Sequence, residues 1–225
     1  MTPLRRVCIV SLLPLVGGID AMGQQSDEPV QLPPPILDGE LSVESALQRR
    51  RSVREFARAP LSLEDVSQIL WAAQGVTERQ GLRTAPSAGA LYPLEVYLVA
   101  GDVEQLEPGI YRYRENAHEL VLMLEGDYRK RLASAALTQS WVHRAPAVVV
   151  IAGVYQRSAR KYGQRAHRYV HIEVGHAAQN VYLQAVARGL GTVLVGAFDD
   201  TRVQRVLELP ADHMPLGLMP VGKTR

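Results

Sequence analysis

The chain of 225 residues is long enough for one large domain or two small ones, each with a hydrophobic core. Its 25 basic and 23 acidic residues give a formal net charge of +2. This near balance argues against a nucleic-acid-binding protein, because binding a polyanion usually requires a dense excess of basic residues. The single cysteine, Cys8, excludes an internal disulfide, a Cys-x-x-Cys redox pair and a metal or iron–sulfur site with several thiolate ligands.

The first 23 residues have the pattern of a secretory signal peptide. Arg5 and Arg6 form a positively charged start, residues 7–16 are mostly apolar, and small residues at positions 21 and 23 suit cleavage by a signal peptidase. The apolar run is shorter than the roughly 20 residues that a membrane-spanning helix needs. We therefore expect an exported protein, periplasmic or extracellular, whose mature chain has no cysteine and no integral membrane segment. If the leader is not functional, the protein would be cytoplasmic.

Residues 24–39 contain four prolines and no periodic pattern, which predicts an extended tether before a single domain over residues 40–225. Within the domain, helix and strand patterns mix without a regular βαβ rhythm, which favours an α+β fold. The second helix begins with a capping box, Ser62-Leu63-Glu64-Asp65. Helices are predicted over residues 41–50, 62–75, 127–141, 163–188 and 199–207. Strands are predicted over residues 94–99, 110–114, 120–124, 148–151, 192–198 and 216–221.

The longest predicted helix, residues 163–188, carries apolar side chains around most of its circumference. A helix of this kind is usually buried on all sides, and so small a domain would need a partner subunit to cover it. His167 and His171 stand four residues apart on one face, as in a helical metal pair, and Glu173 is a possible further ligand. Because no third ligand at a good spacing is evident, we interpret these side chains as polar positions at a helix interface.

Two basic segments lie at opposite ends of the domain. Residues 49–54, Arg-Arg-Arg-Ser-Val-Arg, concentrate four guanidinium groups beside a hydroxyl, and Lys223-Thr224-Arg225 follows the last strand. Guanidinium groups bind phosphate through paired hydrogen bonds, so the two segments would suit one phosphate if the fold brought them together. The alternative for each is a solvated basic surface.

Small residues gather in two further places. The segment 86–93, Pro-Ser-Ala-Gly-Ala-Leu-Tyr-Pro, precedes a predicted strand, and Gly196-Ala197 lies near the end of the strand predicted over 192–198. Small residues let the backbone approach a flat ligand closely, although a simple tight turn is an alternative for the first segment. No Gly-x-Ser-x-Gly, Walker lysine or dinucleotide fingerprint occurs. The pattern is typical of proteins in which a bound cofactor performs the chemistry.

Five segments in the same order resemble the FMN-dependent nitroreductase superfamily, and most closely its SagB-type (thiazoline/oxazoline oxidase-like) dehydrogenase branch. They span the chain from about residue 43 to its end. The segments are Arg50-Arg51-Ser52-Val53-Arg54-Glu55-Phe56, the stretch from Ala85 to Glu95, Lys161-Tyr162-Gly163-Gln164-Arg165, Glu173-Val174-Gly175-His176-Ala177-Ala178-Gln179-Asn180, and Pro220-Val221-Gly222.

The resemblance implies an α+β sandwich with a mostly antiparallel sheet, an intertwined homodimer, and FMN at the subunit interface. It assigns the FMN phosphate and ribityl chain to Arg50, Arg51, Ser52, Lys223 and Arg225. It places Arg54 near flavin N1 and the C2 carbonyl, and the backbone of Gly196 and Ala197 opposite flavin N5. The small-residue loop, Pro86, Ser87, Ala88, Gly89 and Ala90, is expected to contact the cofactor. Tyr162, Arg165 and Tyr169 are candidates for the substrate pocket.

The residue at position 90 distinguishes branches of the superfamily. Many nitroreductases have an asparagine there that contacts the flavin, whereas this chain has Ala90, as in the SagB branch. We therefore expect hydride transfer between flavin N5 and a small organic or peptide-derived substrate, with no catalytic protein side chain and no metal. The alternatives are a nitro- or quinone reductase that uses NADH or NADPH as electron donor, and a flavin-binding protein without turnover.

Overall fold

A computed structural model describes residues 28–225, so the predicted signal peptide and the first part of the predicted tether lie outside the described residues. The centre of the fold is an antiparallel sheet with the strand order β1-β4-β3-β2-β5-β7-β6. Its strands are β1 (Val30–Gln31), β2 (Leu94–Ala100), β3 (Gly109–Arg114), β4 (Glu119–Glu125), β5 (Ala147–Gly153), β6 (Leu190–Thr192) and β7 (Met214–Lys223).

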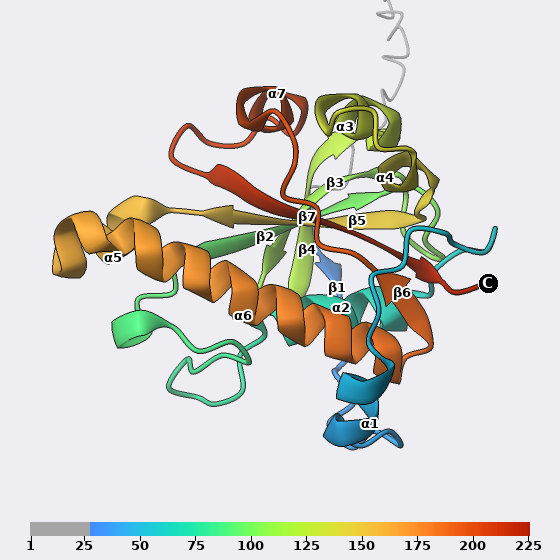
Figure 1. Ribbon diagram of the computed structural model, residues 1–225, viewed down its shortest axis with the longest axis horizontal. Coiled ribbons are helices and arrows are strands. Elements are labelled where there is room, and N and C mark those ends of the chain that lie inside the picture. Colours follow the sequence, from blue (N-terminus) through green and yellow to red (C-terminus); the bar gives the residue numbers. More distant parts are fainter. Residues whose placement is uncertain (1–27) are drawn as a thin grey trace, which may run out of the picture.

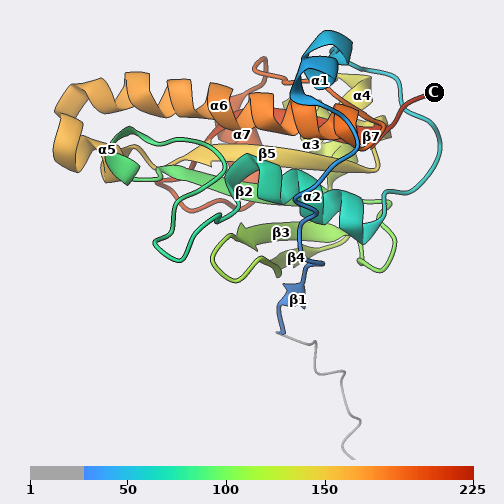
Figure 2. The same ribbon diagram turned by 90° about the horizontal axis from the view of Figure 1, so that it is seen from below.

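Helices cover both faces of this sheet, and the expected α+β sandwich is confirmed. In Figures 1 and 2, α1, α2 and the long α6 lie on one face, while α3, α4 and α7 lie on the other. The helices are α1 (Val43–Arg49), α2 (Leu63–Gln74), α3 (Arg129–Ala135), α4 (Ser140–Arg144), α5 (Tyr155–Tyr162), α6 (Ala166–Ala187) and α7 (Asp200–Val206). Two short 3-10 turns, η1 (Ala88–Ala90) and η2 (Gly163–Arg165), complete the secondary structure.

The two layers of core follow from the alternation of side chains along the strands. In β2, Val96 and Leu98 belong to the cluster beneath α2 and α6, while Tyr97 and Val99 belong to the cluster beneath α3, α4 and α7. Both β2 and β5 are buried on both faces. The continuous apolar run of β5 predicted this burial, whereas β2 contains Glu95 and was predicted from its alternating pattern. The predicted N-cap of α2 is confirmed, since Ser62 Oγ accepts the Asp65 N–H at 3.1 Å. The Asp65 carboxylate accepts hydrogen bonds from Arg188 rather than completing a capping box.

The described part of the predicted tether lies against the domain. β1 pairs with β4, the side chain of Leu32 is buried, and Pro33 accepts a hydrogen bond of 2.6 Å from the Ser67 hydroxyl. The backbone of Ile36 exchanges two hydrogen bonds with the side chain of Gln68 on α2. The proline-rich sequence did not predict these contacts, because the contacts depend on partners distant in sequence.

Three elements differ from the sequence-based expectation. The helix predicted over 127–141 is divided into α3 and α4, because Leu137 and Thr138 adopt left-handed backbone conformations with φ of 54° and 62°. The strand predicted over 192–198 ends at Thr192, and the chain beyond it leaves the sheet except for a bridge between Val195 and Leu218. Helix α5 was not predicted.

Helix α6 buries one face in the single chain rather than its whole circumference. Val170, Val174, Ala177 and Val181 lie in the core, while Ile172 on another face is half exposed. A homodimer that covers this face therefore stays a prediction. Within residues 28–225, no helix combines the length and apolar character needed to cross a membrane.

The lowered pKa values of two histidines predict how the stability of the fold depends on pH. Burial lowers the pKa of both His118 and His213 below the ordinary value of 6.5. The unfolded chain then binds more protons than the folded chain as pH falls below about 6.5, so the free energy of unfolding should decrease between pH 7.5 and 5.5. We expect His213→Gln to show a weaker pH dependence than the wild type in urea unfolding. An equal slope in the two proteins would contradict this account.

Candidate functional site

The first basic segment runs in an extended conformation along the edge of the sheet. Ser52 forms a parallel bridge with Thr192 of β6, and Phe56 forms an antiparallel bridge with Thr224 just after β7. The approach is close because Gly191 has no side chain: a Cβ there would lie 2.6 Å from Val53 Cγ1. The fold thus brings together the two basic segments from opposite ends of the domain, and Figure 1 shows the C-terminus beside the chain that follows α1.

Side chains of this segment are held by contacts with α6 and with the C-terminus. The Arg50 guanidinium lies 5.2 Å above the ring of Tyr182, whose hydroxyl is 3.2 Å from Ser52 Oγ and accepts the Leu194 N–H at 2.8 Å. Arg225 is 3.1 Å from the carboxylate of Glu55. These contacts fix the segment at the edge of β6 and leave the Arg50 guanidinium beside an open surface.

Arg51 has a different environment from the one the sequence suggested. Its Nη1 donates to the carbonyl oxygens of Gln48 and Arg50 at 2.9 and 2.8 Å, which satisfies groups at the C-terminal end of α1. A guanidinium has five N–H donors, so the remaining ones stay free for an anion. Arg51 therefore combines a helix-capping contact with its predicted role.

A cavity of about 250 Å³ lies beside the first basic segment. Arg49, Arg51 and Thr224 contribute to its wall, together with the ring of Tyr182. Thr192 also lines it, and the Thr192 hydroxyl is buried without a hydrogen-bond partner among residues 28–225. The Arg49 and Arg51 side chains at this wall can donate hydrogen bonds to a phosphate, so these residues fit the phosphate end of FMN.

Arg54 and the Gly196-Ala197 segment meet the α3–α4 region. The Arg54 guanidinium lies 5.7 Å above the ring of Trp141, and the carbonyl oxygen of Ala197 accepts a hydrogen bond of 2.7 Å from Gln139 Nε2. A Cβ at Gly196 would meet no atom within 4 Å, so the backbone there is open to a flat ligand. Sequence reasoning did not single out Gln139 or Trp141, because they fell inside a predicted continuous helix.

The small-residue loop is fixed by a buried carboxylate on α6. Glu173 accepts the Ala88 N–H at 3.0 Å, and within the loop the Ser87 hydroxyl accepts the Tyr92 N–H at 2.9 Å. Burial raises the pKa of Glu173. The residue that the sequence offered as a possible metal ligand is thus the anchor of a loop with left-handed backbone at Gly89 and Ala90.

Part of the predicted substrate pocket lies against this loop. A Cβ at Gly89 would lie 2.7 Å from the Tyr162 hydroxyl and 2.9 Å from Lys161 Nζ, so only glycine allows this approach. The rings of Tyr162 and Tyr169 meet edge to face with centroids 4.8 Å apart. Arg165 is exposed on η2. The structure therefore brings Tyr162 and Tyr169 together beside the loop.

The basic segment and the small-residue loop thus contact different parts of α6. Tyr182 supports the first basic segment, whereas Glu173 supports the small-residue loop. Nine residues separate these supports, which corresponds to about 13 Å along a helix that rises 1.5 Å per residue. In one chain the basic segment and the small-residue loop are therefore separate, and we call them the two half-sites.

The histidines of α6 pair with an aromatic side chain. The Tyr155 hydroxyl is 2.6 Å from His171 Nε2, and the Tyr155 ring stacks on His167 with centroids 4.3 Å apart. Among residues 28–225, no group of three His, Cys, Asp or Glu side chains is placed to hold a metal ion.

The role of Glu173 gives a stability prediction. Glu173→Ala removes the acceptor of the Ala88 N–H and should lower the free energy of unfolding by about 1–3 kcal/mol, the usual cost of leaving a buried polar group unpaired. Glu173→Gln keeps a carbonyl acceptor without the charge whose burial is unfavourable, so it should lose much less. Urea unfolding at pH 7 measures both. Equal stability of the two variants would show that Glu173 does not anchor the loop.

The sandwich, the clustered guanidinium groups and the open glycine backbone define a class of α+β proteins suited to a flat, phosphate-bearing cofactor. Comparison with known proteins identifies the family within that class. The sequence model of the Nitroreductase family matches residues 47–223, and the chain belongs to this family.

Relatives cover most of the chain. A protein of Methanocaldococcus jannaschii, provisionally named a nitroreductase, is 50% identical over 184 residues, which are 82% of this chain and 92% of the relative. The trifolitoxin operon protein TfxC of Rhizobium leguminosarum is 29% identical over 203 residues, 83% of this chain and 55% of that protein. A crystal structure of a provisionally named nitroreductase from Ralstonia eutropha is 29% identical, with a TM-score of 0.77 over 89% of this chain and 91% of its own.

Proposed function

We propose that the protein is an FMN-dependent oxidoreductase of the SagB-type branch, which transfers a hydride between flavin N5 and a small organic or peptide-derived substrate. The observation that carries this proposal is the convergence of the two basic segments beside a cavity that Arg49, Arg51 and Thr224 line. Membership of the Nitroreductase family supports it. When bound, FMN would supply the hydride acceptor or donor that the protein side chains lack.

Each part of the first half-site has a role in this function. Arg51, which lines the cavity, would hold the phosphate with the donors not used at α1. Arg50, Ser52, Lys223 and Arg225 adjoin lining residues along the chain and would complete the contacts with the phosphate and ribityl chain. Arg54 places a fixed positive charge where negative charge develops on reduction of the ring. The backbone of Gly196 and Ala197 supplies N–H donors near N5. No acid–base side chain is required in this scheme.

The two half-sites join in a homodimer. The basic segment of one protomer and the small-residue loop of its partner would enclose one cofactor, which resolves their separation along α6. The half-exposed Ile172 on the uncovered face of α6 supports this arrangement. Tyr162 and Tyr169, next to the loop, would then border the substrate.

The substrate class follows from Ala90 and from one relative. A methyl group at this position cannot hydrogen-bond the flavin as an asparagine would, which favours the SagB-type activity over simple nitro reduction. A relative encoded in a toxin operon supports a peptide-derived substrate. We further propose that the leader directs export to the periplasm or outside the cell.

Anaerobic reduction tests this function. The protein reconstituted with FMN should show flavin absorbance that dithionite bleaches. Bleaching by NADH or NADPH would favour the nitro- or quinone reductase, whereas a flavin reduced only by an organic or peptide-derived substrate would support the SagB-type dehydrogenase. A bound flavin that no substrate or nicotinamide reduces would contradict an enzymatic role.

A further inference from the structure

The turn that separates α3 from α4 has an unusual backbone. Leu137 and Thr138 both have positive φ angles, and β-branched threonine rarely adopts this conformation. The turn is followed by Gln139 and then by α4, which contains Trp141 in its first turn. A strained backbone conformation persists only where surrounding contacts stabilise it, so the contacts of this turn should account for its conformation.

The turn contacts the Gly196-Ala197 segment through one hydrogen bond, and the end of α3 holds the chain just after that segment through another. Gln139 Nε2 donates to the Ala197 carbonyl at 2.7 Å and to the Ala136 carbonyl at 2.9 Å. The Asp199 N–H donates to the Ala135 carbonyl at 3.0 Å. Ala197 itself is exposed and has left the sheet, so these bonds replace the ladder contacts that would otherwise fix its backbone.

The same turn supports Arg54. The Trp141 ring packs against the core beneath α3, α4 and α7, and the Arg54 guanidinium lies 5.7 Å above it, within the range of a cation–π interaction. Trp141 Nε1 is buried without a hydrogen-bond partner among the described residues. The contact between the indole and Arg54 is therefore made through the face of the ring.

We propose that Gln139 and Trp141 are positioning residues for the redox half of the cofactor site. Gln139 fixes the peptide group of Ala197, and Trp141 holds the guanidinium of Arg54. The inference rests on the proposed function, because it assigns these residues to the two elements that would face flavin N5 and the N1–C2 edge. A continuous helix over 127–141 would not let Gln139 contact Ala197 while Trp141 contacts Arg54. The strained turn makes both contacts possible.

Redox titration of the reconstituted full chain tests Trp141. Trp141→Leu should lower the equilibrium constant for reduction of bound FMN at least threefold. This corresponds to a reduction potential about 14 mV lower, at 29.6 mV per tenfold for a two-electron couple. The dissociation constant of FMN should stay within about threefold of the wild-type value. Trp141→Phe keeps an aromatic face and should restore the wild-type value. Trp71→Leu, which changes the chain's other tryptophan, should leave the potential unchanged.

A double-mutant cycle with Arg54 separates positioning from general structural damage. If Trp141 acts by holding Arg54, Trp141→Leu should have no further effect on the potential in an Arg54→Ala background. Additive effects would overturn the assignment of Trp141. So would a potential that Trp141→Leu leaves unchanged, or a Trp141→Phe variant as impaired as Trp141→Leu.

Gln139 has an independent test that leaves the core intact. Gln139→Leu should change the visible circular dichroism of bound FMN, which reports the surroundings of the ring. Gln204→Leu is a matched control, because Gln204 Nε2 also bonds backbone carbonyls but lies on α7, at Pro210 and Ala211. Identical spectra for the wild type and Gln139→Leu would overturn the role of Gln139. A wild-type protein that binds no FMN would overturn the proposed function as well, so the two failures are distinguishable.

Discussion

Replacing Arg50 with alanine should weaken FMN binding by about 10- to 150-fold and leave riboflavin binding nearly unchanged. The range corresponds to the loss of one charge-assisted interaction of about 1.5–3 kcal/mol with the phosphate, which riboflavin lacks. The Arg50 guanidinium is held above the ring of Tyr182, so it is preorganised for this contact. Titration of flavin fluorescence with the purified protein measures both dissociation constants.

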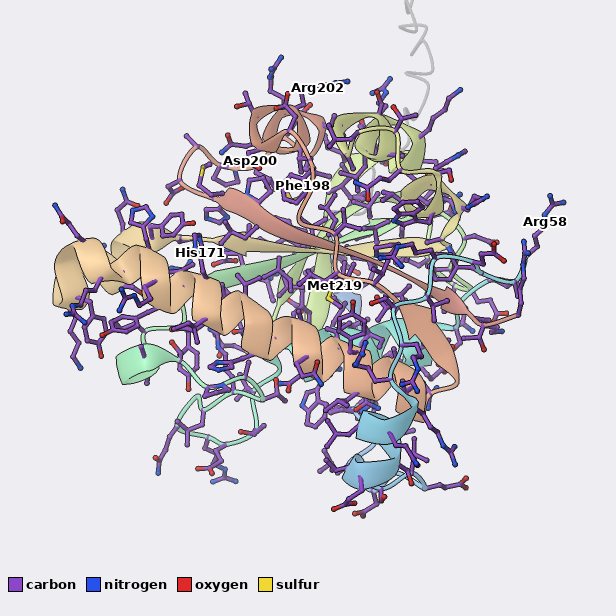
Figure 3. The ribbon with its side chains drawn as sticks, in the orientation of Figure 1. Arg58, His171, Phe198, Asp200, Arg202 and Met219 are labelled. Carbon is purple, nitrogen blue, oxygen red and sulfur yellow. The ribbon has the colours of Figure 1, made fainter. Side chains whose placement is uncertain are left out.

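Arg58→Ala is the matched control for this experiment. It removes the same charge from the same part of the chain, but Arg58 points away from the molecule into solvent (Figure 3). A general effect of net charge would weaken FMN binding similarly in both variants. That outcome would contradict a specific phosphate contact at Arg50.

Replacing Arg54 with alanine should make reduction of bound FMN harder while the cofactor stays bound. A positive charge near N1 and the C2 carbonyl stabilises the negative charge of the reduced ring, so its removal should lower the potential. A loss of about 1–2 kcal/mol corresponds to a shift of roughly 20–45 mV for a two-electron couple. Redox titration against a reference dye measures it, and an unchanged potential would contradict the role of Arg54.

The elements that could be predicted from the sequence are those set by local patterns. An alternating pattern identified β2, a continuous apolar run identified β5, and Ser62 with Asp65 identified the start of α2, because these signals depend on nearby residues. The residues that resemble the family also indicated two loops as parts of the site, and their roles stay predictions. The separation of the basic segment from the small-residue loop along α6 required the structure, because it depends on how both pack on one helix.

The errors share a physical cause, which is competition from distant partners. Residues 136–139 favour a helix locally, but the turn at Leu137 and Thr138 allows Gln139 to reach Ala197. The predicted strand after Thr192 is interrupted because the Leu194 N–H bonds the Tyr182 hydroxyl instead of a neighbouring strand. Glu173 was visible in the sequence, but its contact with Ala88, 85 residues away, was not.

The central claim is that the two basic segments form a phosphate site for FMN. The most direct measurement is a parallel titration of the wild-type protein with FMN and riboflavin, which share the same ring and differ in the phosphate. We expect flavin absorbance after reconstitution with FMN and at least tenfold tighter binding of FMN than of riboflavin. Equal affinities, or no binding of either flavin, would contradict the claim.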